Sequence, residues 1–242
     1  MDTPLYLITQ IGFAATTIFF FGLVLKHLKR ALIQSSITLK KQRSIFNYTI
    51  AGLILWMIVL SALSLKGFFL NFSSFPPRFV IIILVPLITL IWALLISDTT
   101  KELLSIIPPE VIIRLQVFRV VVELLLWLLF IQSLLPIQMT FEGRNFDILA
   151  GISAPFIAYL AFTKKVISKK GVLIWNILCL GLLLNIVITA ILSMPTSFRY
   201  FMNEPANTIV TQFPIVWLPG FLVPLAYGLH FLSIRQLLLQ KD

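Results

Sequence analysis

The sequence predicts an all-α protein: a polytopic membrane protein built as a seven-transmembrane-helix bundle, with its N-terminus outside and its C-terminus cytoplasmic. Hydrophobic residues make up 59% of the 242 residues, and charged residues only 12%. Seven apolar runs are each close to the roughly 20 residues that a membrane-spanning helix needs. Lys and Arg residues concentrate in alternate gaps between these runs, which is the pattern of a chain that crosses a bilayer repeatedly.

The predicted spans, in chain order, cover residues 5–25, 47–69, 78–98, 111–135, 147–163, 171–193 and 211–234. They use most of the sequence, so residues 1–242 are predicted to form a single transmembrane helical domain. Runs such as residues 79–96 are apolar all round, whereas the strands of a membrane barrel alternate apolar and polar residues. The first span is not expected to be cleaved as a signal peptide, because its positive cluster follows the apolar run.

Two predicted spans have unusual ends. The gap after span 1, residues 27–46, is long enough to extend the first helix by several turns, and its apolar residues suggest a partly interfacial helix. Span 7 carries Pro214, Pro219 and Pro224, so a kink or a broken start is expected there.

The charge pattern predicts the orientation. Fifteen of the nineteen Lys and Arg residues fall on one side of the predicted spans, and this side is expected to face the cytoplasm. An odd number of spans places the two termini on opposite sides, in agreement with that assignment. The formal charge of +10 is therefore attributed to contact with anionic lipids at the cytoplasmic face, and no nucleic acid partner is predicted.

Span 4 contains charged residues that lipid should exclude. Residues 120–135 form only about 24 Å of helix, less than the ~30 Å core of a bilayer. The span therefore cannot start after Glu123 and should also take in Arg119. Gln116, Arg119, Glu123 and Trp127 share one stripe of the helix, which should face the bundle interior. The pair is either structural, or part of a polar site in which Glu123 binds a proton or a ligand, or interfacial if the span starts elsewhere.

Two polar residues in other spans can be compared with Glu123 by depth. Asn185 of span 6 lies at nearly the same level, and we predict it as a partner of Glu123; a packing hydrogen bond between helices is the alternative. His230 precedes Arg235 by five residues, which predicts a position nearer the level of Arg114 and a packing role.

The outer gaps hold the remaining charged candidates. One interpretation of the segment before span 5 is local: Asn145 caps the helix, and Asp147 in its first turn is favoured by the helix dipole. The other makes this segment and the gap before span 7 an outer entrance to a site, formed by Glu142, Arg144, Asp147, Arg199 and Glu204.

Motifs of known chemistry are missing from the sequence. There is no His-Glu-x-x-His zinc motif and no phosphate-binding glycine loop, and the single cysteine, Cys179, cannot form a cysteine metal cluster. No catalytic residue, metal or cofactor is therefore predicted, and an enzyme is the less favoured class.

Residues 109–155 contain the pattern Gln116-x-Phe118-Arg119, Pro136, Gly143, Asp147-x-x-x-Gly151 and Ala154-Pro155. This stretch, about a fifth of the chain, resembles small bacterial polytopic membrane proteins of unassigned function. The resemblance implies a multi-pass protein of the bacterial cytoplasmic (inner) membrane, and it implies no chemical role for the motif.

The predicted function is small-molecule or proton-linked transport, or ligand sensing, through a polar site inside the bundle. The residues expected to bind the ligand are Gln116, Arg119, Glu123 and Asn185. A structural or accessory subunit of a membrane complex with no site of its own is the alternative, and a membrane-embedded lipid-modifying enzyme is the third. A cavity that reaches Glu123 would favour the first hypothesis, and a fully packed Arg119–Glu123 pair would favour the second.

Overall fold

The computed structural model describes residues 3–239, and this part of the chain is helical, with no β-strand. The prediction of an all-helical protein is confirmed. Five helical segments within residues 3–239 are long and apolar enough to cross a membrane. They are α1 (Pro4–Gln34), α2 (Leu39–Leu65), α3 (Arg78–Ile96), α8 (Lys169–Leu192) and the segment Leu218–Leu239, which contains α9 (Val223–Leu239).

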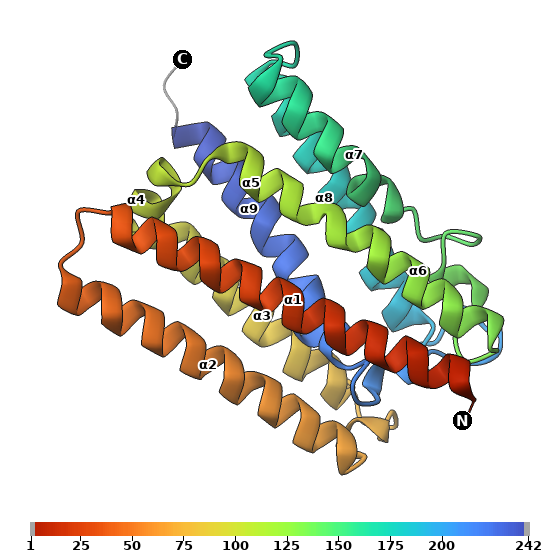
Figure 1. Cartoon of the computed structure of the whole chain (residues 1–242). Helices are drawn as coiled ribbons and strands as arrows, with labels where there is room; N and C mark the ends of the chain where they lie inside the picture. The colour runs from red at the N-terminus through yellow and green to blue at the C-terminus, as the bar shows by residue number, and fades with distance from the viewer. Residues whose placement is uncertain (1–2, 240–242) are drawn as a thin grey trace.

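The shorter helices are α4 (Asp98–Ile106), α5 (Pro109–Arg114), α6 (Phe118–Ile131) and α7 (Ile148–Ala158). Figure 1 shows the long helices lying side by side, with α1 beginning at one end of the bundle and α9 ending at the other. Helix α9 packs against α3, α4, α5 and α8, while α6 packs between α1 and α7. Helix α2 lies at the edge of the bundle, and its buried residues are Gln42 and Leu60.

The fourth predicted span, residues 111–135, is divided in the structure. Helix α5 continues through the 3₁₀ turn Leu115–Val117 into α6, which ends at Ile131. The helix stops short of residue 135 because the chain turns at Ser133, whose backbone φ is 57°. The fifth predicted span corresponds to α7 and the π-helical turn Tyr159–Thr163 that follows it. Both segments are therefore interrupted or short, and neither is among the five long apolar helices.

The last predicted span begins later than expected. The predicted start at residue 211 is wrong, because helical structure suited to a span begins with the π-helical turn Leu218–Leu222. Pro214 and Pro219 lie in this region, and proline removes a helical donor and clashes with the preceding turn. The indole Nε1 of Trp56 donates to the Gly220 carbonyl oxygen at 2.8 Å, so α2 supplies a partner for this irregular backbone. The broken start expected from the prolines is confirmed.

The first helix extends into the gap that follows it, as expected, because α1 continues to Gln34. Helix α2 begins at Leu39, so most of residues 27–46 belongs to these two helices and not to a separate interfacial helix. Side-chain caps mark other helix starts, because Thr3 accepts from the Tyr6 backbone N–H and Ser168 accepts from that of Gly171.

Small residues let α7 approach α6 closely. Ala150, Ala154 and Ala158 are fully buried along one face of α7. A side chain at Gly151 would place its Cβ 2.8 Å from the Val120 backbone nitrogen on α6. This close packing sets the position of the residues that precede α7.

Candidate functional site

The polar stripe of the fourth predicted span faces the interior of the bundle. Gln116, Arg119 and Glu123 have exposed fractions of 1%, 1% and 2%. The Gln116 side chain donates to the Ala226 carbonyl oxygen of α9 at 3.1 Å. Periodicity alone therefore located these three side chains, because helical spacing determines which residues share a face.

Arg119 forms its ion pair with Asp147. The prediction that Arg119 pairs directly with Glu123 is therefore wrong. Its Nε donates to Asp147 Oδ2 at 2.6 Å, and its Nη2 contacts Oδ1, so the two side chains meet in a two-pronged contact. The third guanidinium nitrogen, Nη1, lies 2.8 Å from Nε2 of His230. All three nitrogens of Arg119 are thus engaged within the protein.

The hydrogen bonds of His230 define its protonation. Arginine can only donate, so Nε2 of His230 must accept from Arg119 and carries no proton. The other ring nitrogen, Nδ1, lies 2.9 Å from Asn176 Oδ1, whereas the Asn176 amide nitrogen donates to Val172 and Ser233. His230 is therefore a neutral imidazole with its proton on Nδ1. The predicted level, nearer Arg114 than Glu123, agrees with these contacts, because Gln116 meets Ala226 one helical turn before His230. The contact with Arg119 was not predicted.

Glu123 takes a partner that its own helix does not provide. Its Oε2 accepts from the Asn145 side chain at 2.6 Å, and the same Asn145 nitrogen also donates to the Met139 carbonyl oxygen. The Asn145 Oδ1 accepts from the Asp147 backbone N–H at 3.1 Å, which places Asp147 directly after this contact. Asn145 thus links the Glu123 carboxylate to the backbone of Asp147.

The segment that connects α6 to α7 turns back along α6 into the bundle. Glu142 accepts from Trp127 at 2.6 Å, Asn145 contacts Glu123, and Asp147 contacts Arg119, so successive residues meet successive turns of α6 in reverse order. Non-helical backbone at such depth is tolerated where protein buries it, and Asn145 is 0% exposed. We call residues 142–147 the re-entrant segment.

The residues predicted to form an outer entrance do not all lie together. Asp147 is buried against Arg119 and does not join Arg199 and Glu204. Arg144 is exposed and lies over the Phe201 ring at 5.2 Å, which brings two of the outer gaps together.

The outer gap before α9 carries its own ion pair. Arg199 donates to Glu204 at 2.9 Å, and this hydrogen bond holds the pKa of Glu204 below its ordinary value. The Glu204 side chain is largely in solvent, so the pair is separate from the buried cluster.

Asn185 also has a different partner from the predicted one. Its side-chain nitrogen donates to the Arg144 carbonyl oxygen at 2.7 Å, so it holds the re-entrant segment and not the Glu123 carboxylate. Asn185 was predicted to contact Glu123 because the two residues lie at a similar depth in their spans. The partner of Glu123 is instead Asn145, which lies in the connection between α6 and α7.

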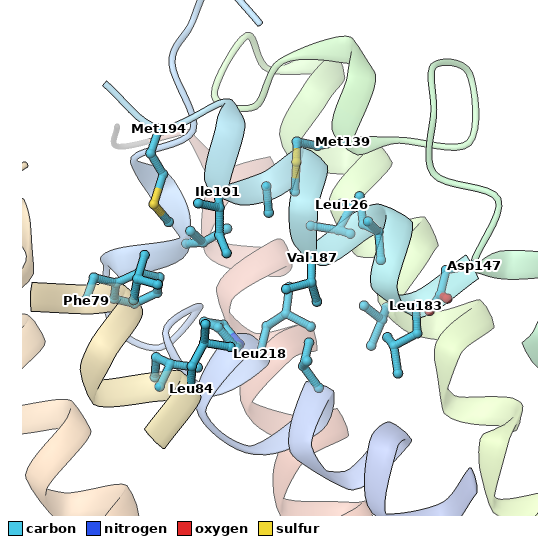
Figure 2. A pocket seen from close by; sticks show the side chains of 18 of the residues that line it. Phe79, Leu84, Leu126, Met139, Asp147, Leu183, Val187, Ile191, Met194 and Leu218 are labelled. Atoms are coloured by element: carbon cyan, nitrogen blue, oxygen red, sulfur yellow. The ribbon is translucent and has the colours of Figure 1, made fainter. Parts of the chain in front are cut away.

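A cavity of about 110 Å³ lies beside the two carboxylates. Residues of α3, α6, α8 and the segment around Leu218 form most of its wall, and Glu123 and Asp147 are the acidic residues that line it. Figure 2 shows Asp147 at one side of the cavity and Phe79 and Met194 at the other. The remaining wall is almost entirely aliphatic, so the cavity is apolar with an acidic end.

Several residues of the cluster were not predicted as part of a site. His230 was assigned to packing, Asn145 was considered only as a helix cap, and Asn176 was not singled out. One feature of the sequence could have indicated them. Polar side chains within an apolar span need hydrogen-bond partners when buried, and Asn176 and His230 are such residues. Within residues 3–239 no group of three His, Cys, Asp or Glu side chains is arranged to bind a metal.

The fold and the site define a helical protein with membrane-length apolar helices and an ion pair buried among them. The chain belongs to the family described as a domain of unknown function (DUF8737), which matches residues 76–238. This range begins just before α3 and contains Arg119, Glu123, Asp147 and His230, whereas α1 and α2 lie outside it. The comparison with curated proteins finds no match, and neither does the comparison with solved structures.

Proposed function

We propose that this protein binds a small molecule inside its helical bundle, as a transporter or a ligand sensor. The observation that carries the proposal is the cavity beside Glu123 and Asp147. A charged group within a bilayer is costly, and such groups usually line a pathway or a site. The apolar wall and the acidic end together suit a molecule with both an apolar part and a polar group.

The buried cluster supports a binding role because one carboxylate is left incompletely engaged. Both oxygens of Asp147 contact Arg119. Glu123, by contrast, accepts one hydrogen bond within residues 3–239, from Asn145 to its Oε2. Glu123 also lines the cavity, so it can bind a proton or a ligand without disrupting the ion pair.

We further propose that the chain crosses the membrane seven times, with its N-terminus outside and its C-terminus in the cytoplasm. The continuous helical path from Pro109 to Ile131 supports a crossing by α5 and α6, and α7 with its π-helical turn supports another. The positive charges favour this orientation. The resemblance of residues 109–155 supports a bacterial inner membrane.

The binding proposal can be tested with two matched substitutions on α8. Val187 lines the cavity, whereas its neighbour Ile188 is 47% exposed on the outer surface of the helix. The full-length protein is purified in nanodiscs of its native lipids, and the small molecules retained are identified by mass spectrometry. Wild type and Ile188→Phe should retain a compound that Val187→Phe loses at least tenfold.

If every retained compound is equally abundant in all three proteins, the binding proposal is wrong. Where a compound does depend on Val187, its flux into proteoliposomes is measured next. Flux indicates transport, and binding without flux indicates sensing.

The topology can be tested with single cysteines. Cys179, the single cysteine of the sequence, is buried and is replaced by Ala to give a cysteine-free background. A membrane-impermeant maleimide applied to intact cells should label Ser73→Cys and Glu142→Cys, and should label Thr38→Cys only after lysis. Labelling of Glu142→Cys only after lysis would show that the segment from α5 to α6 does not cross.

A further inference from the structure

We infer that the ligand is a cationic amphiphile, an aliphatic amine whose ammonium group faces Glu123 and whose chain leaves the cavity between α3 and α8 into the lipid. This inference rests on the proposed binding function and names the class of molecule that the same cavity would take. Three features carry it: the charge balance of the buried cluster, the free acceptor on Glu123, and the half-buried apolar wall between two helices.

The buried cluster contains more acid than base. Within residues 3–239 the buried acidic and basic side chains are Arg119, Glu123, Asp147 and His230. His230 is neutral, because Arg119 donates to its Nε2. One guanidinium therefore faces two carboxyl groups, so when Glu123 is ionised a cation from outside the protein balances the charge at the acidic end of the cavity.

The same contacts oppose an anionic ligand. Each guanidinium nitrogen of Arg119 already has a partner in Asp147 or His230, and Arg119 is not among the residues that line the cavity, so its charge is not presented there to a phosphate or carboxylate. A negative head group in this cavity would instead meet Glu123 and Asp147. Like charges in a low-dielectric site repel strongly, which makes this class unfavourable.

Glu123 is the point at which a donor can bind. Its Oε2 accepts from Asn145, which leaves Oε1 for a ligand that occupies the cavity. An ammonium group carries three donors and no acceptor, so it complements a carboxylate oxygen. A hydrogen bond between two charged groups is shorter and stronger than a neutral one.

The wall of the cavity reaches the outside of the bundle between α3 and α8. Ile83 of α3 and Leu183 of α8 are buried, whereas Leu84 and Val187, the next lining residues outward, are only half-buried. These positions lie within membrane-length apolar helices, so their surroundings are lipid. Both helices pack on α9, whose Val223 also lines the cavity.

The outer end of the cavity is closed. Met139, Met194 and Val210 line it and are 3%, 1% and 4% exposed, so buried side chains separate the cavity from the outer gaps. A ligand that follows the half-buried side instead comes from the bilayer, where amphiphiles concentrate. Lateral access therefore fits the wall better than access from water.

The size of the cavity agrees with a ligand that is only partly enclosed. Its volume of about 110 Å³ is below the roughly 150 Å³ of an apolar cavity that accepts benzene. It can thus hold an ammonium group and a few carbon atoms. A longer chain must continue through the gap between α3 and α8.

The test uses the full-length protein in nanodiscs and three photoreactive probes with the same diazirine-bearing twelve-carbon chain. One probe is a primary amine, one an alcohol and one a carboxylate. After irradiation, labelled residues are mapped by peptide mass spectrometry. The amine should label cavity residues such as Leu84 and Val187 at least tenfold more than the other two, and unlabelled dodecylamine should compete.

Two substitutions test whether amine labelling depends on the Glu123 carboxylate or on any acidic residue of the protein. Glu123→Gln keeps an acceptor for Asn145 and should reduce amine labelling about ten- to a hundredfold, the range expected for a lost hydrogen bond between charged groups. The alcohol should label both proteins equally. Asp98→Asn, at the exposed start of α4 and outside the cavity, serves as the control and should leave amine labelling unchanged.

The outcomes distinguish this inference from the binding proposal. Equal labelling by all three probes, or amine labelling that survives Glu123→Gln, would overturn the cationic class while binding in the cavity stands. Absence of any label at the cavity residues would overturn both. If Glu123→Gln does not fold, the comparison of the three probes on wild type still decides the class.

Access from the bilayer is tested separately by competition. Propylamine, which is water-soluble, should compete at least tenfold less well than dodecylamine. Equal competition would overturn the lateral route.

Discussion

Within residues 3–239 two arginine–carboxylate pairs occur, one inside the bundle and one in the connection between α8 and α9. The Arg119 and Asp147 side chains are 2% and 7% exposed, whereas those of Arg199 and Glu204 are 13% and 73% exposed. The buried arginine also contacts His230, and its partner follows Asn145, which holds Glu123. The outer arginine is held by nearby carbonyl oxygens of Phe201 and Asn203.

The difference shows what burial does to the same pair of chemical groups. Water stabilises each member of an exposed pair separately, so the loss of one member costs little. A buried pair has lost that solvation, and removing one member leaves an uncompensated charge. The buried pair therefore requires a complete set of partners, and its neighbours His230, Asn145 and Asn176 supply them.

The largest effect is expected from Arg119→Met. This change leaves Asp147 buried without its cation and should destabilise the protein by about 3–5 kcal/mol. The measurement is unfolding in mixed detergent micelles, monitored by tryptophan fluorescence. The double variant Arg119→Met/Asp147→Leu should recover most of the loss, because apolar side chains replace both charges; no recovery would contradict the assigned pairing.

A smaller loss is expected from His230→Phe. The substitution leaves one Arg119 donor and the Asn176 acceptor without a partner, and should cost about 2–3 kcal/mol in the same unfolding measurement. The other histidine of the sequence provides the control. His27→Phe, near the end of α1, should change stability by less than about 0.5 kcal/mol. Equal effects at the two positions would show that His230 is not part of the buried cluster.

Gly151→Ala should displace Asp147 from Arg119 without removing a charge. Its Cβ would meet the Val120 nitrogen and the Arg119 Cβ, so α7 must move away from α6, at a cost of about 1–3 kcal/mol. Gly181→Ala is the matched control, because no atom lies within 4 Å of that Cβ. The control should be neutral or slightly stabilising, since Ala favours helix. A destabilised control with an unaffected Gly151→Ala would refute the close approach.

The smallest effect is expected from Glu204→Gln in the exposed pair. Its stability should stay within the error of the unfolding measurement at neutral pH. Arg199 lowers the pKa of Glu204, so any stabilisation is present above the carboxyl group's ordinary pKa and is lost as pH falls through the depressed value. Glu204→Gln should remove that pH dependence. A loss as large as that of Arg119→Met would end the contrast between the two pairs.

Local sequence patterns predicted the helical elements well. Apolar runs located α3 and α8 within two residues at each end, because helix formation in an apolar environment depends on nearby residues. The prolines predicted the irregular start before α9. The end of α6 was missed by four residues, since the turn at Ser133 has no strong signal in the sequence.

Within the site, helical periodicity predicted which residues of span 4 are buried, but not their partners. The predicted partners of Arg119 and Glu123 were wrong because the connection between α6 and α7 enters the bundle. Its residues Asn145 and Asp147 were expected at the outer surface. The expected level of His230 agrees with its contacts, and Arg235, from which that level was counted, donates to the carbonyl oxygens of Leu94 and Ser97 at the end of α3. The hydrogen bond between His230 and Arg119 was missed, because no local pattern indicates it.

The sequence by itself determined an all-helical chain with membrane-length apolar runs and a buried polar stripe on α6. These properties follow from composition and from the 3.6-residue period of the helix. Only the tertiary structure decided that Arg119 pairs with Asp147, that Asn145 holds Glu123, and that a cavity lies beside both carboxylates. Such contacts join residues far apart in the chain, and their geometry depends on how closely helices pack, which no local pattern specifies.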